Sequence, residues 1–341
     1  MNLLYSMLFP YAYYRPIEIS SQKLQQALQE IHNYSLFIFQ QGMPIEEDEL
    51  TELIQDINLG GLCKIRRRYT AKKIQDNGLL INFKIVLATG GFKYVKAALF
   101  INPFGVFPCV KLCSRFRNLF DKKVALRELA YQTRFHGMSC TPRLYHVEAT
   151  AKKVAAYQEL ATRGDLYSTL LDYTIPPATK GHLMQGVLRC VKTIHKKGVV
   201  HADLKPQNIL LHTDYFFVML TDFGLSCETS SRTLTRGTVV FIAPEALSMQ
   251  PLSPKECDKW SAGLILLMIQ KNLHTLPWSG MDLANPERMQ LIHETVAKLH
   301  ASANPVDRLI GRFLSLTPNQ RPHLGKAILA LQALDETHFN P

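Results

Sequence analysis

The stretch HADLKPQN, residues 201–208, places an aspartate, a lysine and an asparagine within one short segment. The carboxylate of Asp203 can accept a proton, the ammonium of Lys205 can neutralise negative charge, and the amide oxygen of Asn208 can bind a hard cation. Fourteen residues after Asn208 the tripeptide DFG begins, and its Asp222 supplies a second oxygen ligand. The pattern predicts a polar site that combines a proton acceptor, a positive charge and oxygen ligands for a divalent ion.

The sequence before this stretch changes from a strand pattern to a helix pattern. Alternation and β-branched residues predict strands, and apolar residues at helical spacing predict helices. We expect three strands in 81–88, 94–101 and 106–113, a helix in 119–135, two strands around a turn in 146–160, and mainly helices from 182 onward. The expected fold class is therefore α+β, with a small antiparallel sheet and one main helix before a larger, mostly helical part.

Residues 1–79 are expected to form a helical N-terminal extension. A cap at Ser20 predicts a first amphipathic helix, and Pro44 with the acidic residues after it predicts a second. The basic run KIRRRYTAKK, residues 64–73, is interpreted as a connector, with a docking or anionic-lipid patch as the alternative. The extension would dock on the rest of the chain, recruit a partner, or only cover apolar surface.

Composition narrows the class of protein. The chain has 341 residues, 47% of them hydrophobic, and a formal charge of +11, which predicts a globular protein without a transmembrane segment. The basic charge has no nucleic-acid motif beside it, so we expect no nucleic-acid partner. The seven cysteines are odd in number and form no C-x-x-C pair, which favours a reducing cytoplasm over a disulfide framework or a zinc site.

Further motifs occur in a fixed order around the opening stretch: LATGGFKYV (87–95), PCVKL with Lys111, LRELA with Glu128, QELA (158–161), GTVVFIAPE (237–245), DKWSAG (258–263) and TPNQRP with Arg321. Together they make residues 80–335 resemble the eukaryotic-type protein kinase family, over the whole catalytic domain. The resemblance implies a bilobal fold with an N-lobe at 80–161, a C-lobe at 162–335 and a tail at 336–341.

The resemblance implies that ATP and Mg²⁺ bind, with Mn²⁺ as an alternative ion. The residues expected to line the nucleotide site are Leu87, Ala88, Gly90, Gly91, Val95, Cys109, Lys111, Glu159, Ala161 and Leu210. Of the family's three loop glycines only Gly90 is kept, because the other two positions hold Ala88 and Lys93. Gln158 is expected to guard the back of the adenine pocket.

The resemblance also assigns roles in catalysis and in the architecture. Lys111 would hold the α- and β-phosphates and pair with Glu128, whereas Asp203 would orient the substrate hydroxyl and accept its proton. Lys205 would stabilise the transferring phosphoryl group. The remaining roles are magnesium binding by Asn208 and Asp222, an ion pair between Glu245 and Arg321, a brace on the catalytic loop by Asp258, and a place for Thr238 in the peptide-binding segment.

Ala202 stands where most of the family has an arginine that contacts a phosphate on the activation segment. The loop therefore resembles the non-RD subset, and the hydroxyl-rich run 227–237 remains open to autophosphorylation. Lys205 and Thr238 favour a serine/threonine protein kinase acting on protein substrates. The alternatives are a pseudokinase scaffold that binds nucleotide or a partner without turnover, and a small-molecule kinase of related fold.

Overall fold

The computed structural model divides the chain into two compact units. The first comprises Met1–Leu126 with Pro142–Arg163, and the second comprises Arg127–Thr141 with Gly164–Pro341. The structure describes residues 69–74, 78–89, 93–102, 105–135, 137–161, 163–212, 217–231, 237–247, 253–283 and 285–340. The two helices predicted before residue 60 lie outside the described residues.

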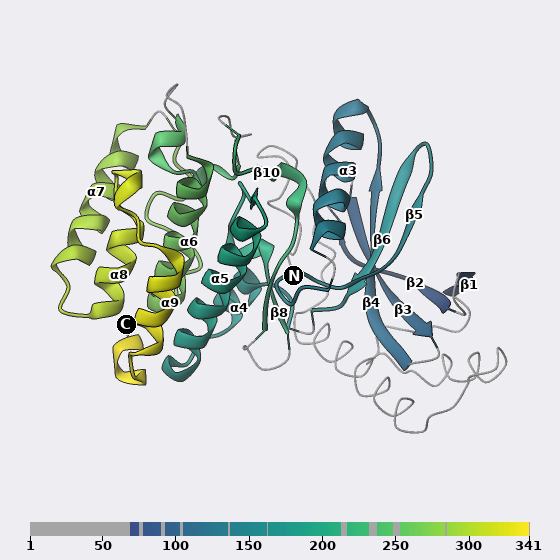
Figure 1. Ribbon diagram of the computed structural model, residues 1–341, viewed down its shortest axis with the longest axis horizontal. Coiled ribbons are helices and arrows are strands. Elements are labelled where there is room, and N and C mark those ends of the chain that lie inside the picture. The colour runs from purple at the N-terminus through teal and green to yellow at the C-terminus, as the bar shows by residue number, and fades with distance from the viewer. Residues whose placement is uncertain are drawn as a thin grey trace. The chain divides into compact units, whose positions relative to one another are not determined.

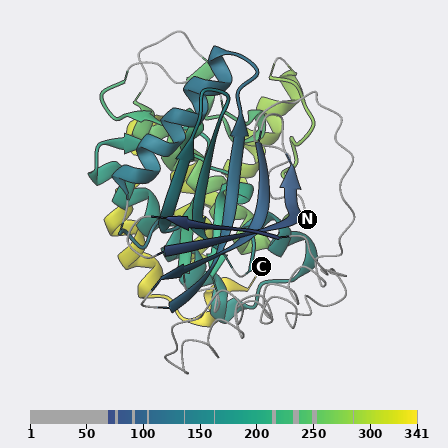
Figure 2. The same ribbon diagram turned by 90° about the vertical axis from the view of Figure 1, so that its right-hand side faces the viewer.

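An antiparallel sheet of six strands dominates the described part of the first unit (Figure 1). Figure 2 shows its strands side by side. They are β1 (Tyr69–Ile74), β2 (Gly78–Thr89), β3 (Lys93–Asn102), β4 (Gly105–Arg115), β5 (Leu144–Ala149) and β6 (Lys153–Glu159), in the spatial order β1-β2-β3-β4-β6-β5. The strands predicted from the alternating pattern are all present.

The sheet begins earlier than the predicted boundary at residue 80. Residues Tyr69–Ile74, assigned above to the helical extension and its basic connector, form β1 and pair with Gly78–Phe83 of β2. The charge of this run concealed its strand character, and β1 is an edge strand, where lysines are common. The extension therefore gives way to the sheet by residue 69.

Cross-strand register assigns the side chains of the sheet to two faces. Paired residues on antiparallel strands point to the same side, and successive residues alternate. Lys111 pairs with Tyr157 on β6, whereas its neighbour Val110 pairs with Gln158. On β3, Val95 pairs with Leu112, so Val95 shares the face of Gln158 and not the face of Lys111.

The second unit is mainly helical. Its helices are α4 (Leu166–Asp172), α5 (Pro177–Lys196), α6 (Pro254–Lys271), α7 (Pro286–Ala301), α8 (Pro305–Phe313) and α9 (Leu324–Gln332), together with the last half of α3 (Leu119–Arg134). Short 3₁₀ segments follow the loops: η1 (Pro206–Asn208), η2 (Phe223–Leu225), η3 (Val239–Phe241), η4 (Pro244–Leu247), η5 (Pro318–Gln320) and η6 (Glu336–Phe339). Proline at the start of α5, α6, α7 and α8 suits the first helical position, where no backbone donor is needed. The predicted α+β class, with an antiparallel sheet before a larger helical part, is confirmed.

Helix α6 forms the centre of the second unit. Its apolar run Leu264–Ile269 is buried throughout, and α6 packs against α5 and α8 (Figure 1). None of the helices in the described part of the chain combines the length and apolar character that a membrane span requires. The first turns of α6 carry Asp258 into this buried region.

Two short ladders connect the helices to the loops of the site. β7 (Val199–Val200) pairs with β10 (Cys227–Glu228), and β8 (Ile209–His212) pairs with β9 (Phe217–Leu220). The segment 201–208 runs from β7 to β8, and Asp222 follows shortly after β9. The motif residues therefore lie at the ends of these strands.

Candidate active site

The carboxylate of Asp203 is held by two residues. Its Oδ2 lies 2.8 Å from Lys205 Nζ, and its Oδ1 accepts a hydrogen bond from the backbone N–H of Thr238 at 2.7 Å. Lys205 Nζ also donates to the Thr238 hydroxyl at 2.7 Å. Asp203 and Lys205 are both buried, so each charge needs the other. These contacts join the catalytic loop to the segment that begins at Gly237.

A small pocket that is partly open to solvent lies beside Asp203. It is lined by Ala202, Asp203, Leu204, Gly237, Thr238, Phe241, Ile242, Ala243, Ala246, Cys257, Asp258 and Ser261. The predicted base and the predicted peptide-binding segment thus border the same space. A hydroxyl that enters this pocket can reach the Asp203 carboxylate.

Asn208 has the properties of a metal ligand. Its Nδ2 donates to the backbone carbonyl of Asp203 at 2.8 Å, which directs the side chain. Its Oδ1 is buried and accepts no hydrogen bond within the part of the chain that the structure describes. A buried oxygen without a donor is unfavourable, and oxygen is the donor that Mg²⁺ prefers. With the buried carboxylate of Asp222, this residue fits a divalent cation.

The backbone at Asp222 is in the left-handed region, with φ 61° and ψ 70°. Such a conformation costs a non-glycine residue on the order of 1–3 kcal/mol and tends to occur at functional sites. The next residue, Phe223, is buried with its ring 4.9 Å from the His201 ring and 5.1 Å from the Phe135 ring. Packing of Phe223 helps to hold Asp222 in this conformation.

Asp258 braces the catalytic loop from α6. Its Oδ2 accepts a hydrogen bond from His201 N and lies 2.8 Å from His195 Nε2, and its Oδ1 accepts one from Ala202 N at 2.9 Å. Ala202 has a positive φ of 65°, so its backbone N–H is held in a strained turn. The brace expected at Asp258 is present in the geometry, and His195 at the end of α5 is a partner that the motifs did not indicate.

Gly237 is a further residue that sequence reasoning missed. A Cβ atom at this position would lie 2.6 Å from Ala202 O and 2.8 Å from Asp203 Oδ1. Only glycine allows this segment to approach the catalytic loop so closely. Gly237 is the first residue of the motif GTVVFIAPE, but its close approach to Asp203 joins two residues that are 34 positions apart in the sequence.

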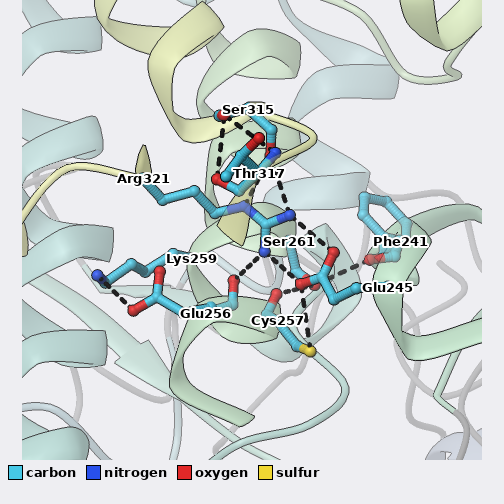
Figure 3. A network of polar contacts seen from close by, with 9 residues as sticks. All are labelled: Phe241, Glu245, Glu256, Cys257, Lys259, Ser261, Ser315, Thr317 and Arg321. Atoms are coloured by element: carbon cyan, nitrogen blue, oxygen red, sulfur yellow. Dashed lines mark hydrogen bonds and ion pairs between the residues drawn. The ribbon is translucent and has the colours of Figure 1, made fainter. Parts of the chain in front are cut away.

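Arg321 and Glu245 form the ion pair that the resemblance implies (Figure 3). The contact is bidentate, with Arg321 Nη1 2.5 Å from Glu245 Oε1 and Nη2 2.8 Å from Oε2. The guanidinium also donates to the backbone carbonyls of Ser315 and Glu256, and Cys257 lies beside Glu245. This network fixes the end of the 237–245 segment against α6.

In the first unit, Lys111 on β4 contacts a strand carboxylate. Its Nζ lies 3.1 Å from Glu148 Oε2 on β5 and 4.7 Å from the centre of the Tyr157 ring. Glu128, the expected helix partner, is buried on the part of α3 that belongs to the second unit. A pair between Lys111 and Glu128 therefore stays a prediction.

The structure separates the residues that were expected to line one nucleotide pocket. Cys109, Lys111 and Glu159 share one face of the sheet, whereas Val95 and Gln158 lie on the other. Tyr157, not Gln158, is the β6 residue that pairs with Lys111, and the places of Gln158 and Val95 at the nucleotide pocket stay predictions. Motif counting fixes order along the chain but not the face on which a strand residue lies.

The other predicted nucleotide residues have the following places. Cys109 is buried, and burial raises the pKa of its thiol well above the ordinary range. Ala161 follows β6 and is buried, and Leu210 lies on β8 in the second unit. Gly90 and Gly91 lie outside the described residues, and the side chains of Leu87 and Ala88 are outside them too.

A model of the protein kinase domain matches residues 106–336. The chain belongs to the protein kinase domain family. This membership agrees with the order of motifs and with the sheet and helices of the kinase domain described above.

Curated relatives carry the same domain. The chain is 34% identical over 189 residues to "Death-associated protein kinase related" of Drosophila melanogaster, covering 53% of this chain and 28% of the relative. It is 33% identical over 205 residues to "Serine/threonine-protein kinase H1 homolog" of Danio rerio, covering 54% and 46%. It is 34% identical over 151 residues to "CBL-interacting protein kinase 29" of Oryza sativa subsp. japonica, covering 43% and 33%. The chain thus spans less than half the length of each of these relatives.

Proposed function

We propose that the chain is a serine/threonine protein kinase that transfers the γ-phosphoryl group of ATP to a serine or threonine hydroxyl of a protein. The observation that supports this most is the contact of Asp203 with Lys205 and Thr238 beside an open pocket. A base, a cation and a peptide-binding residue occur there together. The names of the relatives in the Drosophila and zebrafish comparisons agree with this class of reaction.

Asp203 is the proposed base of the transfer. A substrate oxygen forms a bond to the γ-phosphorus, the bond from that phosphorus to the β,γ-bridging oxygen breaks, and ADP leaves. The hydroxyl proton passes to the Asp203 carboxylate. Lys205, 2.8 Å from that carboxylate, stabilises the negative charge of the phosphoryl group. Lys111 is the proposed contact of the α- and β-phosphates.

Asn208 and Asp222 are the proposed magnesium ligands, with Mn²⁺ as an alternative ion. The buried, unpartnered Oδ1 of Asn208 supports this choice within the described residues. When bound, the ion would neutralise charge on the β- and γ-phosphates. The hydrogen bond from Asn208 Nδ2 to the Asp203 carbonyl keeps this ligand next to the base.

We further propose that activity needs no contact between an arginine and a phosphate on the activation segment, although the segment can be autophosphorylated. Ala202 offers only a methyl group at that position. The start of the segment has another anchor, since Arg134 Nη1 lies 2.7 Å from Glu228 Oε1 and Arg134 Nη2 donates to Lys197 O at 2.6 Å. The ladder of β7 and β10 adds backbone hydrogen bonds at the same place.

The cellular location of the chain and its docking partner are proposals as well. We propose a cytoplasmic location, in accord with the free thiols of the described cysteines. The name of the rice relative says that it interacts with a CBL protein. For this chain we propose only that residues before the sheet bind a docking partner or the kinase domain itself.

The test is phosphoryl transfer from γ-labelled ATP with Mg²⁺, both to the chain itself and to a generic basic protein. The wild type should label serine and threonine, and Asp203→Asn should reduce the rate at least about 100-fold, because the base and its pair with Lys205 are lost. Asp172→Asn, an exposed carboxylate on α4, is the matched control and should keep the wild-type rate. A wild type that binds ATP but transfers nothing would contradict the enzyme and favour a scaffold. Phosphorylation of small alcohols but not of proteins would favour a small-molecule kinase.

A further inference from the structure

The backbone of η3 (Val239–Phe241), in the proposed peptide-binding segment, is held by side chains from outside that segment. Arg288, on α7, donates from Nη2 to the carbonyl oxygen of Val239 at 2.9 Å. Trp278, in the loop before α7, donates from Nε1 to the carbonyl oxygen of Val240 at 3.1 Å. Two consecutive carbonyls are thus bound by residues that lie 49 and 38 positions farther along the chain.

A third side chain contacts the end of the same turn. Ser261 Oγ, on α6, lies 2.9 Å from the carbonyl oxygen of Phe241 and 3.2 Å from that of Cys257 (Figure 3). A hydroxyl has one hydrogen to donate, and the shorter distance favours Phe241. Each carbonyl of η3 therefore has a side-chain donor of its own, and these donors and η3 all belong to the second compact unit.

The guanidinium of Arg288 is buried at a cost to stability. Arg288 is 1% exposed, and its Nε and Nη1 have no hydrogen-bond partner among the residues that the structure describes. Burial lowers the pKa of Arg288, yet an arginine stays charged at neutral pH. A buried charge with so few partners is unfavourable, and groups that break this rule tend to lie at functional sites.

The turn η3 connects a contact of the base to the wall of the pocket. Thr238, directly before η3, donates its backbone N–H to Asp203 Oδ1 at 2.7 Å. Phe241, at the end of η3, lines the pocket beside Asp203 and donates its backbone N–H to Thr238 O at 2.9 Å. A shift of η3 would therefore move both the contact with the base and the surface that a substrate meets.

We propose that Arg288 and Trp278 position the protein substrate for transfer, because they hold η3 through the carbonyls of Val239 and Val240. This inference rests on the proposed function, since it concerns the segment assigned there to the substrate peptide. Both are positioning residues that act through η3, and neither lines the pocket beside Asp203. Their loss should weaken the binding of the protein substrate and leave the binding of ATP unchanged.

The first test is Arg288→Met, which removes every donor and keeps an unbranched apolar side chain. The KM for the protein substrate should rise about tenfold, whereas the KM for ATP should not change. Replacement of a buried charge by an apolar side chain is often neutral or stabilising, so Tm should stay the same or rise. Steady-state kinetics, with ATP and the protein substrate varied separately, and thermal unfolding measure these quantities.

The second test is Trp278→Phe, which keeps an aromatic ring at a buried position and removes the N–H that binds Val240. The KM for the protein substrate should rise about threefold, because a neutral hydrogen bond contributes less than one from a charged donor. The KM for ATP should again stay at the wild-type value.

Arg308→Met is the matched control. Arg308, an exposed residue of α8, also donates to backbone carbonyls, since its Nη1 lies 2.9 Å from Ser302 O and 2.6 Å from Ala303 O. These carbonyls lie outside the peptide-binding segment, so both KM values should stay at the wild-type level.

Two outcomes would sink the inference while the proposed function stands, in a protein whose wild type transfers phosphate and whose Asp203→Asn variant does not. One is an unchanged KM for the protein substrate in both Arg288→Met and Trp278→Phe. The other is a rise of both KM values together with a fall in Tm in Arg288→Met, because a general loosening of the fold would produce that result.

If the wild type does not transfer phosphate, amide hydrogen exchange at η3 decides the matter. The backbone N–H groups of Phe241 and Ile242 donate to carbonyls at the start of the turn, so their exchange rates report on how firmly η3 is held. Faster exchange in Arg288→Met than in Arg308→Met would support the hold on η3, and equal exchange would contradict it.

Discussion

The loop around Asp203 and the strand around Lys111 differ in where along the chain their partners lie. Asp203 contacts Lys205 two residues away, Asn208 five residues away and Thr238 35 residues away. Lys111 contacts Glu148 and Tyr157, which are 37 and 46 residues away on other strands. A loop motif thus carries most of its own partners, whereas a strand residue obtains them from the register of the sheet.

This difference explains which parts of the site could be predicted. The spacing of Asp203, Lys205 and Asn208 fixes their chemistry and, in a short loop, much of their proximity. The strands were predicted from alternation, but alternation leaves open which face each residue occupies. For that reason the sequence did not show that Cys109 and Val95 lie on different faces of the sheet, and it did not indicate the contact of Glu148 with Lys111.

The largest expected effect comes from Asp258, the contact of the loop that lies farthest away along the chain. Asp258→Asn replaces one acceptor by a donor that faces the N–H groups of His201 and Ala202. Hydrogen bonds to a charged group contribute about 1.5–3 kcal/mol each, so we expect a loss of about 2–4 kcal/mol of stability and at least about 100-fold in kcat. Chemical denaturation and the transfer assay measure the two quantities.

Glu256→Gln is the matched change on the same helix. Its side chain pairs with Lys259 one turn away at 2.8 Å, and pairs of this kind contribute about 1 kcal/mol or less. Activity should stay at the wild-type level. If Asp258→Asn changed stability and kcat as little as this control does, the loop would be held by its local contacts alone. The loop would then differ from Lys111, whose partners lie on other strands, even more than described above.

The same difference between local and long-range determinants applies to the prediction of helices and strands. Residues Leu264–Ile269 were expected inside a helix, and they form the buried centre of α6. The run 64–73 was interpreted as a connector because its charges dominate the pattern, yet backbone pairing with β2 makes Tyr69–Ile74 a strand. Burial of an apolar run can be predicted locally, whereas an edge strand depends on the neighbour that it joins.

An intermediate loss of kcat is expected from a change at the contact between the catalytic loop and the 237–245 segment. In Gly237→Ala the new methyl group would lie 2.6 Å from Ala202 O and 2.8 Å from Asp203 Oδ1, so the segment must move away from the base. We expect kcat to fall about 10- to 100-fold, which corresponds to about 1.4–2.8 kcal/mol of barrier. The KM for ATP should change little, since Lys111 is not touched.

Gly280→Ala is the control for Gly237→Ala, because it introduces backbone strain without steric crowding. Gly280 has a φ of 84°, and a methyl group added there would meet no atom of the described residues within 4 Å. This variant should lose about 1 kcal/mol of stability and keep its activity. Equal losses of activity in the two alanine variants would mean that the approach of Gly237 to Asp203 has no special role.

The smallest expected effect is a change in stability at Ala202, and it is a gain where the other variants lose stability or activity. Its φ of 65° is unfavourable for any residue with a Cβ, so Ala202→Gly should relieve strain that offsets the extra freedom of glycine in the unfolded chain. We expect a stability change between zero and a gain of about 1 kcal/mol, with activity retained because the N–H that binds Asp258 remains.

Ala330→Gly, within helix α9, is the control and should instead lose about 1 kcal/mol of stability. Thermal unfolding of both variants provides the comparison. A loss at position 202 as large as the loss at position 330 would show that the methyl group, and not the backbone turn alone, supports the loop.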